Sequence, residues 1–491
     1  MARFKVILLF IAVLSLALAG LFGYGETVTA EAAEPVDYLS VAPAADGLGT
    51  EAEPYIPDAA VPQALRGAAF LRFIDEGLDS SSFSDIYFEL DQDFNLADIA
   101  GFVPIGKGRV NSFAGIFNGN GFSISNLSIA SADQFTGLFS VLAEAQVFDL
   151  NLANFTVSST ASYTGVLAGA AGVSELSDIT VSASVVHGSH FLGGVAGIAN
   201  DSVISGVSVL NLTATAGLNA GGAFGVLVSS EATDVTVEEL NLTASDAVGG
   251  VFGRVAASEI EYATFRSGTL NAQASAGGIA GFCEGGSMSL SRSAGTLTAA
   301  NKLGGLIGEV ALSAPLFIEN CYSISALSKS PSGTMFNYIG GLIGYFTTSQ
   351  VNYLRIADCY FSGSLFAPNI ESYGGIFGVS IRLTNPNTTY VSAESCYYNE
   401  SCFVSLTSRP FPSSSESDKI SYKNIYDNRA RLIASYQGFD FDDVWVIDTN
   451  ASSGFGKYPD FARYHSVHKI RLITGDGSPA AQQFPYVGLM P

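Results

Sequence analysis

Five residues, Gly193-Gly-Val-Ala-Gly197, return along this chain with small variations. The phrase also stands at 249–253, 277–281, 304–308, 340–344 and 374–378, and weaker copies stand at 136–140, 164–168 and 221–225. The second residue is a glycine in every copy: Gly137, Gly165, Gly194, Gly222, Gly250, Gly278, Gly305, Gly341 and Gly375. The steps between these glycines are 28, 29, 28, 28, 28, 27, 36 and 34 residues. A nearly constant period of this length is the signature of a stacked repeat.

Short alternating stretches follow each copy of the phrase. After 193–197, a polar corner at 199–202 precedes two such stretches, 204–209 and 212–214. Alternation with a period of two, bounded by turns, is typical of β-strands. We therefore expect three short strands in each repeat.

Matched leucines stand eight residues before the second residue of the following phrase. They are Leu242, Leu270 and Leu297, and each is followed by a polar residue, Thr243, Asn271 or Thr298. Because successive residues of a strand point to opposite faces, the leucines are expected to face inward and the polar row outward. Ice binding would require a flat face of regular threonine ranks, and this single row is too mixed to favour it.

The period and the alternation predict an all-β fold, a right-handed parallel β-helix with coils of about 28 residues. Each coil pairs its backbone with the coils above and below, and stability grows through contacts between neighbouring coils. The nine glycines are expected at tight corners, where a positive φ or a close backbone approach resists a Cβ.

Both ends of the repeat array carry a different pattern. Leu65, Ala69, Phe70 and Phe73 recur at roughly helical spacing within 60–76 and predict one short helix. Such a helix would cover the open end of the stack, whose unpaired N–H and C=O groups would otherwise recruit other chains. The only tryptophan stands within 431–464, which we interpret as the C-terminal cap.

The chain divides into five predicted parts: a signal peptide (1–30), a leader (31–59), the repeat β-helix (60–430), the cap (431–464) and a flexible tail (465–491). Arg3 and Lys5 precede an apolar run from Val6 to Leu21, and Val28-Thr29-Ala30 offers a small-residue cleavage site. The run is also long enough for an uncleaved signal anchor. We expect a secreted or cell-surface protein, with no membrane insertion once the signal is removed.

The composition narrows the choice of partners. Only 14% of the 491 residues are charged, and 22 Lys and Arg face 45 Asp and Glu, a formal net charge of −23. Nucleic acids and anionic membranes are bound through basic patches, so an acidic chain argues against both. The same balance suits a soluble extracellular protein.

Five cysteines in so long a chain do not form a disulfide scaffold. Cys321, Cys359 and Cys396 each open a Cys-Tyr pair at steps of 38 and 37 residues, which predicts a column of buried thiols. Cys396 and Cys402 are close enough in sequence for a local disulfide. No cysteine spacing resembles a zinc site.

Several further marks stand in a fixed order along the chain. They are Gly47-x-Gly49-Thr50 with Pro54-Tyr55, Phe117-Asn-Gly119-Asn-Gly121, the Cys-Tyr pairs, Gly438-Phe-Asp-Phe441 with Val444-Trp445, and Tyr458-Pro459. With the glycine phrase, they resemble the GLUG-repeat proteins, β-helices of secreted and surface proteins. The resemblance runs from about Gly47 to Tyr464.

The resemblance implies an adhesin-like or peptidase-associated surface protein, and the family has no single biochemical activity. Two features depart from the family pattern. Phe122 stands where such proteins commonly have His, and Ser140 and Ala168 replace the closing glycine of the first two phrases.

A search of the sequence for catalytic and metal-binding residues assigns none. Glycoside hydrolysis requires two carboxylates about 5–10 Å apart, whereas Glu284, Glu319 and Asp358 have no acidic or basic partner nearby in sequence. His187 and His190 have no acidic ligand close by, and the acids of 440–443 lack the spacing of a calcium loop. No His-Glu-x-x-His zinc motif exists, and no cofactor is implied.

Asn-x-Ser/Thr sequons stand at Asn126, Asn154, Asn200, Asn211, Asn241, Asn387, Asn399 and Asn450. In a chain so rich in Ser and Thr, many of them are expected by chance, and they become glycans only in a host with that machinery.

The function expected from these patterns is non-catalytic. A secreted or surface repeat protein would contact extracellular glycans or proteins through rows of Ser, Thr, Asn and Tyr. The alternative is a carbohydrate-active enzyme, a polysaccharide lyase or glycoside hydrolase, on the same scaffold. A cluster of two or more carboxylates with a Lys or Arg on one side of the helix would favour that alternative.

Overall fold

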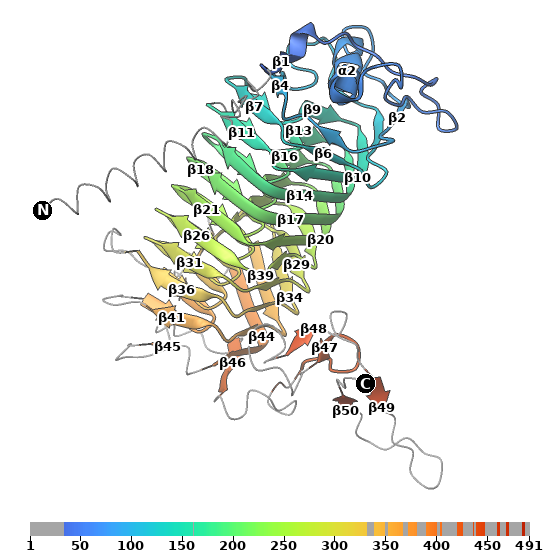
Figure 1. The fold of residues 1–491 in the computed structure, drawn as a ribbon. Helices are drawn as coiled ribbons and strands as arrows, with labels where there is room; N and C mark the ends of the chain where they lie inside the picture. Colours follow the sequence, from blue (N-terminus) through green and yellow to red (C-terminus); the bar gives the residue numbers. More distant parts are fainter. Residues whose placement is uncertain are drawn as a thin grey trace, which may run out of the picture. The chain divides into compact units, whose positions relative to one another are not determined.

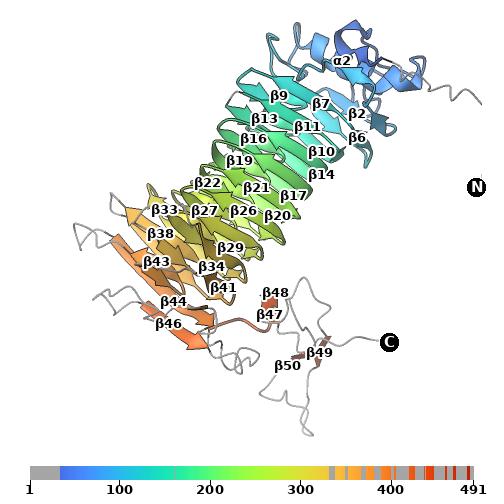
Figure 2. The same cartoon turned by 60° about the vertical axis from the view of Figure 1, so that its left-hand side comes forward.

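Successive coils of the chain lie on one another in the computed structural model and pair backbone to backbone (Figures 1 and 2). The structure describes residues 34–160, 162–330, 338–348, 352–366, 372–380, 389–399, 403–404, 420–425, 436, 438–446, 459–461, 468–470 and 484–486. Three parallel sheets run along the stack, and the strands of the first two follow one another in chain order. The predicted all-β parallel solenoid, with about nine coils of roughly 28 residues, is confirmed.

The first two sheets flank the glycine phrase and have nine strands each. The first sheet contains β8 (Phe135–Thr136), β12 (Tyr163–Thr164), β15 (Phe191–Gly193), β18 (Leu218–Gly221), β22 (Asp246–Gly249), β27 (Ser275–Gly277), β32 (Lys302–Gly304), β37 (Tyr338–Gly340) and β42 (Ser372–Gly374). The second contains β9 (Phe139–Ala143), β13 (Ala168–Gly172), β16 (Ala196–Asn200), β19 (Phe224–Val228), β23 (Phe252–Ala256), β28 (Ala280–Cys283), β33 (Ile307–Leu312), β38 (Ile343–Thr348) and β43 (Phe377–Ser380).

The third sheet bends through the remainder of each coil. Its strands are β2 (Tyr87–Glu89), β3 (Phe94–Asn95), β5 (Ile116–Asn118), β6 (Ser123–Ser125), β7 (Ser128–Ser131), β10 (Gln146–Ala153), β11 (Thr156–Ser159), β14 (Glu175–His187), β17 (Val203–Thr215), β20 (Glu231–Glu238), β21 (Leu240–Ala244), β24 (Ser258–Glu261), β25 (Thr264–Phe265), β26 (Gly268–Ala272), β29 (Gly286–Ser289), β30 (Arg292–Ser293), β31 (Thr296–Ala299), β34 (Leu316–Glu319), β35 (Tyr322–Ser323), β36 (Ala326–Lys329), β39 (Asn352–Ala357), β40 (Tyr360–Phe361), β41 (Ser364–Phe366), β44 (Thr389–Asn399), β45 (Phe403–Val404) and β46 (Ile420–Ile425). The coils with β12–β14 and β15–β17 have the three strands expected, whereas the coil from β22 to β26 has five, because its part of the third sheet is divided into β24, β25 and β26.

Short elements complete the chain. They are β1 (Val36–Asp37), the 3-10 helix η1 (Tyr38–Ser40), α2 (Gln63–Gly77), β4 (Ile99–Ala100), β47 (Trp445–Val446), β48 (Asp460–Phe461), β49 (His468–Ile470) and β50 (Phe484–Tyr486). The β1–β4 pair is parallel, whereas β47–β48 and β49–β50 are antiparallel.

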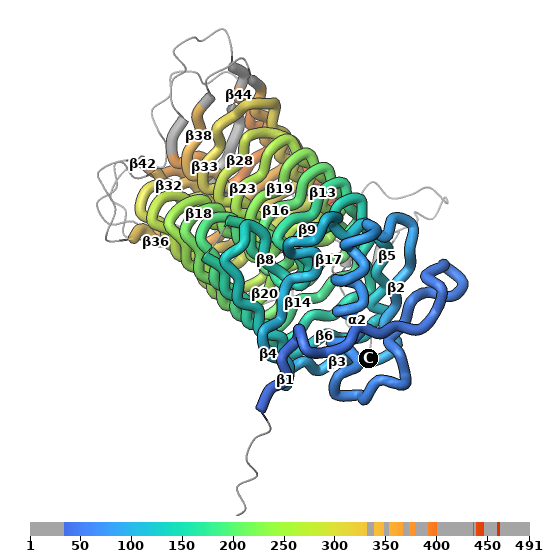
Figure 3. Tube along the Cα trace, turned by 90° about the horizontal axis from the view of Figure 1, so that it is seen from above, coloured from blue at the N-terminus to red at the C-terminus, as the bar shows by residue number. Residues whose placement is uncertain are grey.

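The matched leucines form one column in the interior. Leu242 pairs with Leu270, and Leu270 with Leu297. The column continues through Leu327 to Leu365, and all five side chains are buried. Figure 3 looks along this stack of coils. The inward leucine row and the outward polar row predicted from the alternation are thus confirmed.

Close approach of neighbouring coils explains the glycine phrase. A Cβ on Gly194, Gly222, Gly250, Gly278, Gly305 or Gly341 would lie 2.0–2.3 Å from the carbonyl oxygen of the matching glycine in the next coil. A Cβ on Gly249, the first residue of its phrase, would lie 1.7 Å from the Phe252 carbonyl oxygen. None of the nine predicted glycines has a positive φ. Of the two reasons expected for these glycines, only the close backbone approach applies.

Positive φ values occur instead at the corners of the third sheet. Many of these residues are Asn or Asp, which tolerate the left-handed region better than other non-glycine residues. They include Asn126, Asp149, Asn154, Asp178, Asp201, Asn211, Asp234, Asn320 and Asp358, with φ between 49° and 61°. Short polar side chains therefore turn the chain where the glycines do not.

The predicted helix covers the first coils. Helix α2 (Gln63–Gly77) lies across β3 at the N-terminal end of the stack (Figure 3). Phe70 packs edge-on against Phe88 and Phe94, at centroid distances of 6.3 and 6.5 Å. At Gly67 a Cβ would lie 2.6 Å from the Phe94 ring, so the helix sits as close to the sheet as its backbone allows.

The described residues from Val36 onward form one compact unit. The predicted signal peptide, most of the predicted tail and Cys402 lie outside the described residues. Among the described residues, no helix is both long and apolar enough to cross a membrane.

Candidate functional site

The outward faces of the coils carry the residues that could act on a ligand. The first segment of the third sheet holds an acidic strip of two columns. One column contains Glu175, Glu231 and Glu259, the other contains Glu261, Glu319 and Glu394, and uncharged residues and Arg355 occupy the remaining positions. The last segment of the same coils, from β7 to β36, presents mainly Ser, Thr and Asn, together with Ala130, Val185, His187 and Ala326, and no Asp or Glu points outward there. Charge is thus separated between two strips of one sheet.

An arginine joins two glutamates of the acidic strip. Arg355 on β39 donates hydrogen bonds to Glu319 on the preceding coil and to Glu394 on the following one, the latter at 3.4 Å. All three side chains are 33–57% exposed. Stacking therefore supplies the basic partner that Glu319 lacks nearby in sequence.

Asp358 stands beside this group at a positive-φ corner. Burial raises the pKa of its carboxyl, and the nearby Arg355 and a hydrogen bond from Ser395 only partly oppose that rise. General acid–base pairs are built from an acid that keeps its proton more readily and a second carboxylate close by. The four residues Glu319, Arg355, Asp358 and Glu394 form what we call the corner cluster.

Other acids are also paired with cations. Glu284 accepts hydrogen bonds from Arg254 of the preceding coil at 2.7 and 3.0 Å, and Arg254 lies over the Phe282 ring. Lys302 lies 2.6 Å from Glu309 of its own coil and over the ring of Tyr345 of the next coil. Both acids are therefore engaged with a cation.

The two histidines do not assemble a metal site. His187 is exposed at the end of β14, and His190 Nδ1 lies 2.7 Å from the Ser189 hydroxyl. In the part of the chain that the structure describes, no three His, Cys, Asp or Glu side chains are grouped to hold a metal ion. Asp440, in the other region considered for a metal, accepts hydrogen bonds from the N–H groups of Asp442 and Asp443 and so closes a turn.

The column of buried thiols predicted from the Cys-Tyr pairs is confirmed. Cys321, Cys359 and Cys396 are buried one above another, and the Cys321 N–H donates to Cys359 Sγ at 3.3 Å. Burial raises the pKa of Cys396 to about 12 and that of Cys359 well above its ordinary value. Such thiols carry almost no thiolate at neutral pH and are poor nucleophiles.

The structure does not test the predicted disulfide between Cys396 and Cys402. Cys396 is a free thiol inside the solenoid, within 3.3 Å of the Glu394 carbonyl oxygen. Because Cys402 lies outside the described residues, the disulfide stays a prediction.

The tyrosines that follow these cysteines face the other way and are covered by a C-terminal segment. We call residues 436, 438–446 and 459–461 the C-terminal strap. Its aromatic rings lie on Tyr322, Tyr360 and Tyr397, and the first two of these stack at 4.8 Å. Trp445 is fully buried there and donates from Nε1 to Asn320 at 3.2 Å. The region interpreted as a cap thus lies along the side of the late coils.

A buried ion pair fixes the strap. Arg292 on β30 donates to Asp460 at 2.7 Å, and the Tyr322 hydroxyl donates to the same carboxylate oxygen. The Arg292 and Asp460 side chains are only 3% and 2% exposed. Burial and the Asp460 charge raise the pKa of Tyr322, which keeps the phenol as a donor.

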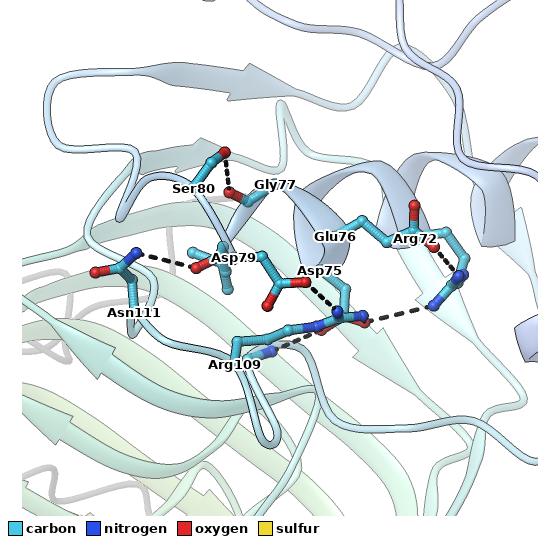
Figure 4. Close-up of polar contacts among 10 residues, drawn as sticks. Arg72, Asp75, Glu76, Gly77, Asp79, Ser80, Arg109 and Asn111 are labelled. Carbon is cyan, nitrogen blue, oxygen red and sulfur yellow. Dashed lines mark hydrogen bonds and ion pairs between the residues drawn. The ribbon is translucent and has the colours of Figure 1, made fainter.

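The N-terminal end has a comparable cluster, shown in Figure 4. Asp75 of α2 accepts from Arg109 at 2.6 and 3.2 Å and from the Gly106 N–H at 3.0 Å. Arg109 also reaches Asp79 at 2.7 Å, and Asn111 donates to the Leu78 carbonyl oxygen at 3.0 Å. The cluster ties the loop after the first coil to the end of the helix, and each acid in it faces a cation.

The backbone geometry of the coil corners explains why several Asn-x-Ser/Thr sequons occur where they do. Asn126, Asn154 and Asn211 have φ values of 61°, 57° and 55°. In each case a buried apolar residue follows, and the outward residue after it is Ser or Thr. A left-handed corner followed by strand alternation therefore produces Asn-x-Ser/Thr in the first coils, rather than chance alone.

Sequence reasoning missed the basic partners of these acids. Arg254 and Arg355 stand one period away from Glu284 and Glu319, so the repeat length could have indicated both pairs. Arg292 and Asp460 are 168 residues apart, and no pattern in the sequence links them.

Comparisons with known proteins complete this description. No protein-family model matches the chain, and no curated protein does. Among solved structures, a "putative immunoglobulin A1 protease" from Bacteroides ovatus aligns over 85% of this chain and 94% of its own, at 19% identity and a TM-score of 0.32. The fold assignment rests on the strand pairing itself.

Proposed function

We propose that this chain is a non-catalytic, secreted or cell-surface repeat protein that binds extracellular glycan or protein ligands through its outer strips. We further propose, from the motifs quoted above, that it is a GLUG-repeat protein. The start of the chain, with its signal-like run, supports export.

The observation that supports this proposal is the placement of the charged side chains on the outer surface. Several acids pair with a cation of the neighbouring coil, as Glu284 does with Arg254 and Glu319 with Arg355. These pairs hold coils together, and the last segment of the third sheet, which has no outward Asp or Glu from β7 to β36, leaves uncharged polar side chains open to a ligand. Repetition of one weak contact over many coils is a route to avidity without a deep pocket.

The test is binding by the purified full chain. Glycan arrays, a panel of matrix proteins and whole cells should retain it, and Glu394→Gln in the corner cluster should leave that binding unchanged. A chain that binds none of these materials would refute the proposal.

One observation favours the second candidate, a carbohydrate-active enzyme. The corner cluster brings two glutamates, an arginine and an aspartic acid of raised pKa to one side of the solenoid. In that role Asp358 would donate a proton to the leaving oxygen, and a glutamate would act as base or nucleophile.

Incubation with a panel of acidic and neutral polysaccharides distinguishes the two candidates. An enzyme would release reducing ends or unsaturated products, and Asp358→Asn and Glu394→Gln would abolish that release. Glu231→Gln, on the same strip several coils away, is the matched control and should leave the release intact.

A further inference from the structure

The end of each coil in the third sheet builds a face of two threonine-rich columns. We call it the threonine face; it consists of Thr213, Thr215, Asn241, Thr243, Thr269, Asn271, Thr296 and Thr298. These residues pair in register, coil on coil, along β17, β21, β26 and β31. The row of Thr243, Asn271 and Thr298 is mixed by itself, but the structure sets a second row of Thr213, Asn241, Thr269 and Thr296 beside it.

The two columns continue beyond the threonine face. Toward the N-terminus they hold Val185 and His187 of β14 and then Thr156 and Ser158 of β11, and toward the C-terminus Ala326 and Ser328 of β36. Between β7 and β36 neither column contains Asp, Glu, Lys or Arg, although the whole chain carries a net charge of −23. Among the described residues of these two columns, His187 is the one ionisable side chain, and it lies one coil outside the threonine face.

The face is regular in two directions. Neighbouring coils are about 4.8 Å apart, and the two outward residues of one strand are about 6.6 Å apart. Threonine is stiff at χ1, so its hydroxyl and methyl groups hold a fixed direction. Beneath them, the buried column of Leu242, Leu270 and Leu297 keeps the strands level. The result is a rigid, two-dimensional lattice of hydroxyl and methyl groups.

The ligand for such a lattice must be uncharged and must repeat in two dimensions. A single soluble polymer chain repeats in only one direction. Sugar rings are also commonly held against the open face of an aromatic ring, and the threonine face contains no aromatic residue. Ice presents a neutral surface of water oxygens with spacings close to these two, and ordered waters can bridge to threonine hydroxyls at little cost.

We propose that the threonine face binds ice. Water molecules held between the two threonine columns would join the first layer of the crystal, and each coil would add one more rank of contacts. This inference goes beyond the proposed binding of glycan or protein ligands and does not require it.

The experiment measures how much of the purified full chain enters a slowly growing ice hemisphere, together with inhibition of ice recrystallisation. Thr243→Lys with Thr269→Lys places two long charged side chains in the middle of the face. Thr233→Lys places one on the acidic strip of the same sheet, where it meets glutamates, and serves as the control. Circular dichroism checks that all three proteins are folded.

The wild-type chain and Thr233→Lys should be taken up by ice, and the double variant should lose about tenfold in uptake, one decade of affinity. Exclusion of the wild-type chain from ice overturns the inference, and so does equal uptake by all three proteins. A chain that is excluded from ice but binds crystalline chitin or cellulose also overturns it while supporting the glycan proposal. Binding to neither ice nor any glycan, protein or cell refutes both.

Discussion

The two ends of the molecule are each held by a carboxylate and an arginine, but in different surroundings. At the N-terminal end Asp75 is buried, whereas Arg109 is 20% exposed and shares its charge with Asp79. At the C-terminal strap both Asp460 and Arg292 are withdrawn from water. The first pair can be rehydrated when it is broken, whereas the second cannot.

That difference predicts different costs for the same kind of mutation. Removing one partner of a fully buried pair leaves an uncompensated charge, and the penalty exceeds the worth of the pair itself. A partner that reaches water, as Arg109 does, is rehydrated when the pair is broken, and the penalty is smaller. Removing one partner should therefore destabilise the C-terminal strap, where both partners are buried, more than the N-terminal end.

The largest effect is expected for Arg292→Met. The change leaves the Asp460 carboxylate buried without its cation, which should cost about 3–5 kcal/mol. Hydrogen exchange and limited proteolysis should show the strap, read at Trp445 and Phe461, opening while the first coils stay protected.

Arg266→Met is the control, because Arg266 pairs with Glu238 at 3.6 Å and both side chains are well exposed. It should cost less than about 1 kcal/mol. Equal losses for the two arginine variants would contradict the role assigned to burial.

A middle effect is expected for Asp75→Asn. The amide keeps the shape of the side chain but weakens its charge-assisted hydrogen bonds, at a cost of about 1.5–3 kcal/mol in the free energy of unfolding. Urea unfolding, together with exchange of the Gly106 amide, measures it. Glu76→Gln on the same helix, at a 42% exposed carboxylate, should change stability much less. A loss larger than that of Arg292→Met would reverse the comparison.

Alkaline pH should separate the two halves of the molecule. All five cysteines lie at or beyond Cys283, and burial raises the pKa of Cys283 from 9.0 to about 12. Above pH 9 the unfolded thiol loses its proton while the folded one keeps it. The unfolded state then binds fewer protons, so stability falls as pH rises.

By pH 10 the buried Cys283 thiol should cost about 1 kcal/mol, and Cys359 and Cys396, whose pKa values are also raised, should act in the same direction. The buried tyrosines of both ends begin to contribute only above their ordinary pKa of 10.0. Exchange should therefore rise in the late coils between pH 9 and 10 while the first coils hold. Cys283→Ala should flatten this pH dependence, and an unchanged profile in that variant would count against the thiols.

The smallest effect is expected for Asp79→Ala. Its carboxylate is 54% exposed and only shares Arg109 with Asp75. A loss below about 0.5 kcal/mol in urea unfolding is expected. A loss near that of Asp75→Asn would show that the N-terminal cluster acts as one unit.

Much of the scaffold could be predicted because stacking converts sequence period into spatial neighbourhood. Gly194 meets Gly222, and Leu242 meets Leu270, since one coil is one repeat. The helix expected within residues 60–76 could also be predicted, because the spacing of its apolar residues is a local property. In the structure it spans Gln63–Gly77. The acid–arginine pairs of neighbouring coils follow the same period, but the sequence was searched only for partners nearby in the chain.

The sequence by itself determined the coil: its length, its inward leucines and the glycines that let neighbouring backbones touch. These properties are short-range or periodic, and they recur in so many coils that single departures from the pattern do not hide them. Only the tertiary structure decided what lies outside the coil. Asp460 finds Arg292 across 168 residues, because chain folding sets side by side residues that no period connects.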